Sequence, residues 1–120
     1  MNKELVEEYK ELTATCARTD YTNKSSLRKH NKAAKRMYEI VDEIRKSQKQ
    51  EQLNQFVELL DIADNKTNLW AAVQMLEKLS VDNETETKAL KIIKSESQGN
   101  SADALGYQIW LNKWTENNKK

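Results

Sequence analysis

The sequence of 120 residues contains no proline and only two glycines, Gly99 and Gly106. Tight hairpins and sharply twisted sheets depend on turn formers such as glycine, whereas the abundant Lys, Glu, Leu and Ala favour helices. The chain is therefore predicted to be all-α. Its length suits one domain with one modest core, which we place at residues 1–116, followed by a frayed tail at 117–120.

A single cysteine, Cys16, rules out an intrachain disulfide and with it a disulfide-stabilised secreted scaffold. No apolar run approaches the roughly 20 residues that a membrane-spanning helix needs, and the first segment is polar within a few residues, unlike a secretion signal. We therefore expect a cytoplasmic protein without a membrane anchor. Because 38% of the residues are hydrophobic, the chain can form a core and is not disordered.

Residues that catalyse reactions or bind metals are also scarce. His30 is the only histidine and Cys16 the only thiol, so a zinc site lacks ligands, and no glycine-rich phosphate-binding loop is present. A Cys16–His30 dyad is conceivable if antiparallel neighbouring helices carry the two residues. However, Cys16 lies on an apolar stripe and is more simply a buried structural residue, with His30 at a helix surface or boundary. We predict no enzyme, no catalytic residue, no metal and no cofactor.

What the sequence does contain is helical periodicity. Apolar residues recur every three to four positions in six segments: 2–17, a second that starts within 23–26 and ends near 47, 51–63, 66–79, 84–97 and 102–116. A turn at Asp64 and Asn65 precedes the fourth segment. That segment is apolar almost all round, which is typical of a helix covered on several sides, so we expect it at the centre of the fold.

A weak internal repeat relates the second, fourth and sixth segments. Met37, Met75 and Trp110 fall at equivalent positions, and each follows a small residue by about one turn. One helix pair cannot bury its apolar face alone, so this pattern predicts three antiparallel pairs stacked as a short HEAT-like solenoid. The alternative is chance similarity between helices of like composition.

Charge is distributed unevenly although the net charge is only +1. Residues 24–50 carry nine Lys/Arg and three Asp/Glu, whereas residues 51–87 carry two and eight. These segments could neutralise one another within the fold, or each could face a partner. The basic stripe of residues 24–50 could also bind phosphates, so a nucleic-acid-binding module is the alternative function, although a pI near 7.8 disfavours it.

The three tryptophans have two interpretations. Trp70, Trp110 and Trp114 could all pack in the core or cover its end. A terminal repeat lacks a neighbour on one side, however, so part of the set Tyr107, Trp110 and Trp114 could be exposed, and exposed aromatic residues serve as anchors for partner proteins.

The run Leu69-Trp70-Ala71-Ala72 after a turn, followed by a last helix that ends in Trp114, resembles a known family. It is similar to the small bacterial HEAT-like helical domains of unknown function, although Asn68 stands where that family has Arg or Val. Members are often encoded beside polymorphic or contact-dependent toxins. The resemblance therefore implies an immunity protein that neutralises a cognate toxin by binding it, and it defines no catalytic residues.

On this basis we expect a protein-binding inhibitor whose partner is a toxin domain, with a nuclease as one candidate target. The acidic segment 51–87 would then match the basic substrate site of the nuclease. Nucleic acid and membranes are not expected partners, and the free protein is expected to be monomeric. The residues predicted to contact the partner are those on the exposed sides of the second, fourth and sixth helices: Lys32, Arg36, Gln74, Lys78, Trp110 and Asn112.

Overall fold

The computed structural model describes the backbone of residues 2–117 and the side chains of residues 5–117. Six α-helices are present in this part of the chain. They are α1 (Asn2–Ala17), α2 (Lys24–Ser47), α3 (Gln50–Val57), α4 (Thr67–Lys78), α5 (Asn83–Ser97) and α6 (Ala102–Asn117). Two short 3-10 helices, η1 (Glu58–Asp61) and η2 (Asp64–Lys66), lie between α3 and α4.

The predicted all-α class and the six predicted helices are confirmed. The third segment differs in one respect, because α3 ends at Val57 and the chain continues as the tighter turn η1. The expected turn before α4 is also present, and it is left-handed at Asn65 (φ 56°) and Lys66 (φ 58°). Of the expected frayed tail, Asn117 still belongs to α6, and residues 118–120 lie outside the described residues.

Side chains that accept backbone hydrogen bonds mark the starts of three helices. Asn23 Oδ1 accepts from the Ser26 N–H (3.0 Å) before α2, and Asp82 Oδ1 accepts from the Thr85 N–H (2.8 Å) before α5. Ser101 Oγ accepts from the Ala104 N–H (3.1 Å) at the start of α6. Each satisfies a backbone donor that has no partner within its helix, and such caps are worth about 1 kcal/mol.

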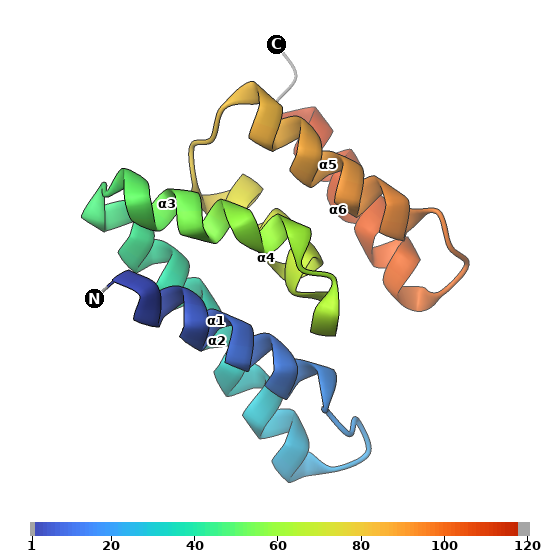
Figure 1. Ribbon diagram of the computed structural model, residues 1–120. Helices are drawn as coiled ribbons and strands as arrows, with labels where there is room; N and C mark the ends of the chain where they lie inside the picture. The colour runs from blue at the N-terminus through green and yellow to red at the C-terminus, as the bar shows by residue number, and fades with distance from the viewer. Residues whose placement is uncertain (1, 118–120) are drawn as a thin grey trace.

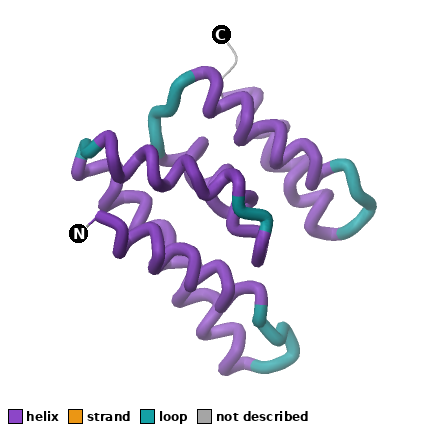
Figure 2. The backbone as a smooth tube through the Cα atoms, in the orientation of Figure 1, coloured by secondary structure: helices purple, strands orange, loops and turns teal. Residues whose placement is uncertain are grey.

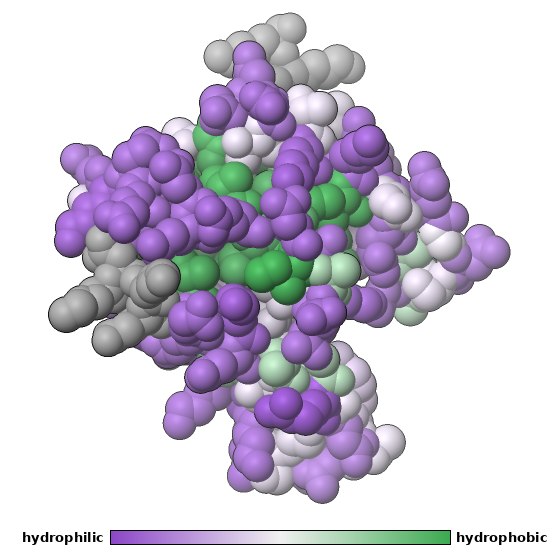
Figure 3. Space-filling model, viewed as in Figure 1, coloured by the Kyte–Doolittle hydropathy of each residue, from purple (hydrophilic) through white to green (hydrophobic). Residues whose placement is uncertain are grey.

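The helices lie in two layers (Figure 1). α1, α3 and α5 are toward the viewer, and α2, α4 and α6 lie behind them. Short loops connect most neighbouring helices (Figure 2). The molecule measures 39 × 36 × 22 Å, and its smallest dimension matches two helices of about 10 Å each. The viewed face is mostly hydrophilic, with hydrophobic side chains gathered along its middle (Figure 3).

α4 is the central element, as predicted. It contacts α1 and α2 on one side, α5 on the other, and η1 before it in the chain. Six of its 12 residues are buried, among them Ala71 and Ala72, whose small side chains let the neighbouring helices approach closely. Other buried side chains around it come from α2, α3 and α5: Met37, Ile40, Val41, Ile44, Phe56, Ala89 and Ile93.

Two buried hydrogen bonds join α1 to the start and middle of α4. Tyr9 Oη donates to Gln74 Oε1 at 2.7 Å, and the hydroxyls of Thr13 and Thr67 are 2.8 Å apart. Tyr9 also packs edge-on against Phe56, with ring centroids 5.0 Å apart. The prediction that Gln74 lies on an exposed side of its helix is wrong, because α1 covers that face of α4 and buries the amide completely.

The Tyr9–Gln74 bond yields a prediction about stability. Tyr9→Phe leaves Gln74 Oε1 buried without a donor, which is expected to lower the free energy of unfolding by about 1–3 kcal/mol in urea denaturation. Tyr21→Phe is the matched control, because Tyr21 is 68% exposed and its change should be within about 0.5 kcal/mol. Equal effects of the two substitutions would contradict the importance of the buried bond.

Candidate functional site

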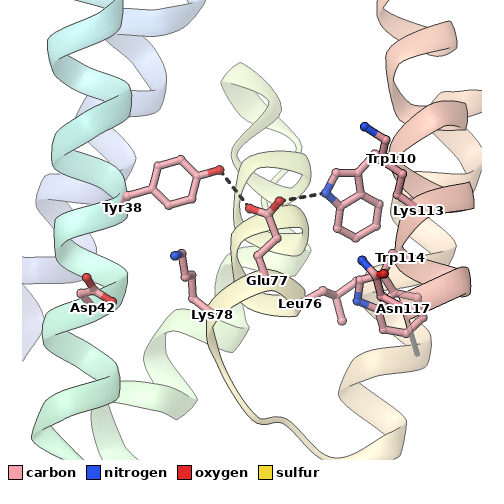
Figure 4. Close-up of a pocket in the computed structure, with 9 residues that line it drawn as sticks. All are labelled: Tyr38, Asp42, Leu76, Glu77, Lys78, Trp110, Lys113, Trp114 and Asn117. Carbon is pink, nitrogen blue, oxygen red and sulfur yellow. Dashed lines mark hydrogen bonds between the residues drawn. The ribbon is translucent and has the colours of Figure 1, made fainter. Parts of the chain in front are cut away.

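α2, α4 and α6 run side by side in the same direction and share a hollow of about 820 Å³ (Figure 4). We call this hollow the aromatic groove. Its lining combines aromatic, charged and amide side chains from all three helices: Tyr38, Asp42, Leu76, Glu77, Lys78, Trp110, Lys113, Trp114 and Asn117.

Glu77 lies in the middle of the groove and accepts a hydrogen bond from a residue on each of its two walls. Its Oε1 accepts a hydrogen bond from Tyr38 Oη on α2 (2.9 Å), and its Oε2 accepts one from Trp110 Nε1 on α6 (3.0 Å). Both donors are neutral, and the side chain of Glu77 is exposed. A carboxylate can accept about four hydrogen bonds, so Glu77 retains capacity for a further donor.

Three aromatic side chains, Tyr38, Trp110 and Trp114, line the groove. Trp110 and Trp114 are one turn apart on α6, and their rings are almost parallel, 14° apart with centroids 6.3 Å from each other. On the opposite wall, Lys78 Nζ lies 5.9 Å from the centroid of the Tyr38 ring, within the range of a cation–π contact. The groove therefore offers flat π-faces beside a fixed carboxylate.

The surroundings of Tyr38 alter its acidity. Partial burial, followed by the hydrogen bond to Glu77 and the negative charge of Glu77, raises the pKa of Tyr38 from the usual 10.0 to about 12. All three effects favour the neutral phenol, since ionisation would place two negative charges side by side and remove the donor.

The predicted contact residues separate into four groups. Lys78 and Trp110 line the aromatic groove, and Asn112 is exposed on α6 outside its lining. Lys32 and Arg36 lie near α1 instead, where they help to line a second hollow of about 460 Å³. Gln74, as described above, is buried.

Sequence reasoning missed Tyr38 and Glu77 as site residues. Glu77 was considered only as part of the acidic segment, and Tyr38 only as part of the basic one. The internal repeat contains a signal that could have found them. Met37 and Met75 are equivalent in the repeat, Tyr38 follows Met37 directly, and Glu77 lies two residues after Met75. Residues beside such equivalent positions come together when the helices lie side by side.

The burial of the tryptophans bears on whether they pack in the core or are exposed at its end. Trp70 lies near the start of α4, half-buried, with its ring 6.3 Å from that of His30. Tyr107, Trp110 and Trp114 are likewise half-buried, and Tyr107 and Trp110 pack against the core. The last helix thus keeps part of its aromatic surface accessible, but none of the three side chains is fully exposed, and their role as anchors for a partner stays a prediction.

Arg36 takes part in the fold rather than in a free basic stripe. Its Nε and Nη2 donate to the two carboxylate oxygens of Glu8 on α1 (2.7 and 3.0 Å), and Nη1 lies 3.4 Å from both Glu39 and Glu43. The Arg36 guanidinium lowers the pKa of Glu8. This pairing is the geometry in which arginine binds a carboxylate most strongly.

The cations in the first half of α2, from Lys24 to Lys35, lack such partners, whereas Arg45 pairs with Asp42 at 3.1 Å. Within the side chains described, residues 5–117, none of these forms an ion pair: Lys24, Arg28, Lys29, Lys32 and Lys35. Nor does any ion pair in that part of the chain join residues 24–50 to residues 51–87. Direct pairing therefore does not neutralise the two segments there.

The conceivable Cys16–His30 dyad is not assembled. His30 Nδ1 lies 3.0 Å from Thr19 Oγ1, and its ring is beside Tyr21. Cys16 is buried, as predicted, and burial raises the pKa of its thiol, which disfavours the reactive thiolate. In the described part of the chain, no three His, Cys, Asp or Glu side chains are grouped so that they could hold a metal ion.

No known protein family, curated protein or solved structure matches the chain. The likeness to bacterial HEAT-like domains thus stays a prediction. None of the described helices is both long and apolar enough to cross a membrane.

The bridge at Glu77 yields a prediction about titration. Glu77→Gln is expected to lower the pKa of Tyr38 from about 12 toward 10.0, because the substitution removes the anionic acceptor. NMR titration of the tyrosine Cζ resonances, assigned with Tyr38→Phe, measures this shift. In the wild type, the stabilisation due to Tyr38 is complete below pH 10.0 and is lost as the pH rises through about 12.

Glu11→Gln is the control for this titration. Glu11 is exposed on α1 and does not line the groove, so its substitution should leave the Tyr38 curve unchanged. An unchanged Tyr38 pKa in Glu77→Gln would show that the bridge does not form in solution.

Proposed function

We propose that this protein is a protein-binding inhibitor, an immunity protein that neutralises a cognate bacterial toxin domain by direct binding in the cytoplasm. We further propose that its three helix pairs form a short HEAT-like solenoid, with α2, α4 and α6 as the equivalent members that carry the binding face. The protein acts without a cofactor and performs no chemistry of its own. The family resemblance supports the toxin as partner, and the aromatic groove supports protein binding.

The observation that carries the proposal is the presence of Tyr38, Trp110 and Trp114 around one groove. Tyr and Trp are enriched among the residues that dominate the energy of protein interfaces, because they bury a large area while losing little conformational entropy. Here Glu77 already fixes Tyr38 and Trp110 by hydrogen bonds. Less ordering is then required when the partner binds, which favours affinity.

Charge supports a basic partner. Residues 51–87, to which Glu77 belongs, carry a surplus of six negative charges, although the groove lining itself is balanced, with Asp42 and Glu77 against Lys78 and Lys113. A nuclease toxin needs a positively charged site for the phosphates of its substrate. A complementary negative surface on the inhibitor accelerates association with such a site and can occupy it.

Co-expression with a toxin encoded by an adjacent gene tests this function. Wild-type protein is expected to restore growth, and Trp110→Ala is expected to weaken toxin binding by about 30-fold or more, as measured by calorimetry, because it removes an interface anchor. Ile109→Ala is the matched control, since Ile109 is 48% exposed on the same helix but does not line the groove. Continued killing in the presence of folded wild-type protein would rule out the proposed function.

A nucleic-acid-binding module is the second candidate, favoured by the five cations of α2 from Lys24 to Lys35 that form no ion pair in the described region. Contacts with phosphates are strongest at low salt, so binding of a labelled DNA or RNA duplex should be detectable at about 50 mM salt. Its absence under that condition would eliminate this candidate.

A further inference from the structure

We infer that the aromatic groove is a receptor for an arginine side chain of the partner protein, with Glu77 as the acceptor of its guanidinium and the rings of Tyr38 and Trp110 as its walls. This inference rests on the proposed function, because it names the partner chemistry recognised at the same groove. It goes further by specifying one residue type and one acceptor.

Glu77 differs from other acids nearby in having no ion-pair partner in the described part of the chain. Other acids nearby have a cationic partner, such as Asp42 with Arg45 at 3.1 Å. Glu77 forms no ion pair in the described part of the chain, and its two hydrogen bonds come from neutral groups. Those bonds hold the carboxylate in place without cancelling its charge. A fixed, exposed and uncompensated carboxylate attracts a cationic donor.

A flat aromatic surface lies beside the carboxylate of Glu77. A guanidinium group is planar, binds a carboxylate through parallel N–H donors and stacks on aromatic rings, whereas an ammonium group is a compact point charge. The nearly parallel rings of Trp110 and Trp114 offer such a stacking surface. The combination of a carboxylate and π-faces therefore selects arginine over lysine.

A cation already lies over one aromatic ring of the groove, that of Tyr38. The ammonium of Lys78 lies over Tyr38, although the carboxylate of Glu77 is adjacent in the sequence. Lys78 is exposed, so its flexible side chain can leave. The partner's guanidinium would replace this ammonium, which makes Lys78 a competitor for the site. Lys113 also lines the groove and contributes a second repulsive charge.

The centre of the groove is open to solvent, because Glu77 and Lys78 are exposed. With a groove of about 820 Å³, there is room for an arginine and the backbone on either side of it.

The probe for this inference is the blocked tripeptide Gly-Arg-Gly, with the citrulline peptide as its neutral counterpart. Binding is followed through the Trp110 indole N–H resonance in ¹H–¹⁵N NMR spectra. The arginine peptide is expected to cause a saturable shift, and the citrulline peptide almost none. Glu77→Gln is expected to weaken arginine binding by about tenfold or more, since a charged hydrogen bond is lost.

Lys78→Met is expected to change binding in the opposite direction. It removes the competing ammonium and should strengthen binding of the arginine peptide by at least about twofold. Glu11→Gln, a matched change of charge on α1, should leave binding unaltered. A merely structural role for Glu77 would not produce opposite effects of these two groove substitutions in folded proteins.

Three results would overturn the arginine receptor: equal binding of the arginine and citrulline peptides, unchanged binding in Glu77→Gln, or no shift at a peptide concentration of roughly 50 mM. Toxin neutralisation separates this failure from failure of the proposed function. If Trp110→Ala loses neutralisation but Glu77→Gln retains it, the groove binds the toxin without an arginine contact. If wild-type protein does not neutralise the toxin, the proposed function itself is wrong.

Discussion

The burial of α4 is the constraint on which the rest of the structure depends. This helix has apolar side chains on several sides, and no single neighbour could cover them. α1 and α2 cover it from one side and α5 from the other, so the two outer helix pairs are held together through it. Its consecutive small residues, Ala71 and Ala72, permit this because they let helices approach where larger side chains would separate them.

The same arrangement creates the aromatic groove. When α2, α4 and α6 lie side by side, one face of each helix packs in the core, and the adjacent face lines the groove and contacts solvent. Tyr38, Glu77 and Trp110 lie on these shared faces and are joined by hydrogen bonds. The packing of the core and the geometry of the groove are therefore set by the same helix positions, and loss of α4 packing would separate the walls of the groove.

Much of the fold could be predicted from the sequence, because helix periodicity and capping residues are local signals. Asn23 and Asp82, for example, mark helix starts by their own chemistry. Gln74 could not be placed correctly, because a polar side chain in a helix is normally exposed and its partner, Tyr9, is distant in the sequence. Arg36 was counted as a free cation for the same reason, since its main partner Glu8 is on another helix.

The groove was harder to predict than the fold. Its residues come from three helices, and nothing local in the sequence indicates that Tyr38, Glu77 and Trp110 meet. Only the weak repeat suggested that their helices are neighbours. The tryptophans of α6 are an intermediate case: their place on the last helix could be predicted from the sequence, whereas the partner of Trp110 on α4, Glu77, could not.

The distribution of the groove over three separate helices has a consequence for the evolution of specificity. Tyr38 and Glu77 lie on helices whose core contacts are made by other side chains, such as Met37 and Met75, whereas Trp110 itself packs against the core. Changes at Tyr38 and Glu77 can thus accumulate while the fold is preserved. The chemistry of the groove can therefore vary on its α2 and α4 sides with the interior unchanged, whereas on its α6 side it varies only together with the packing of that helix.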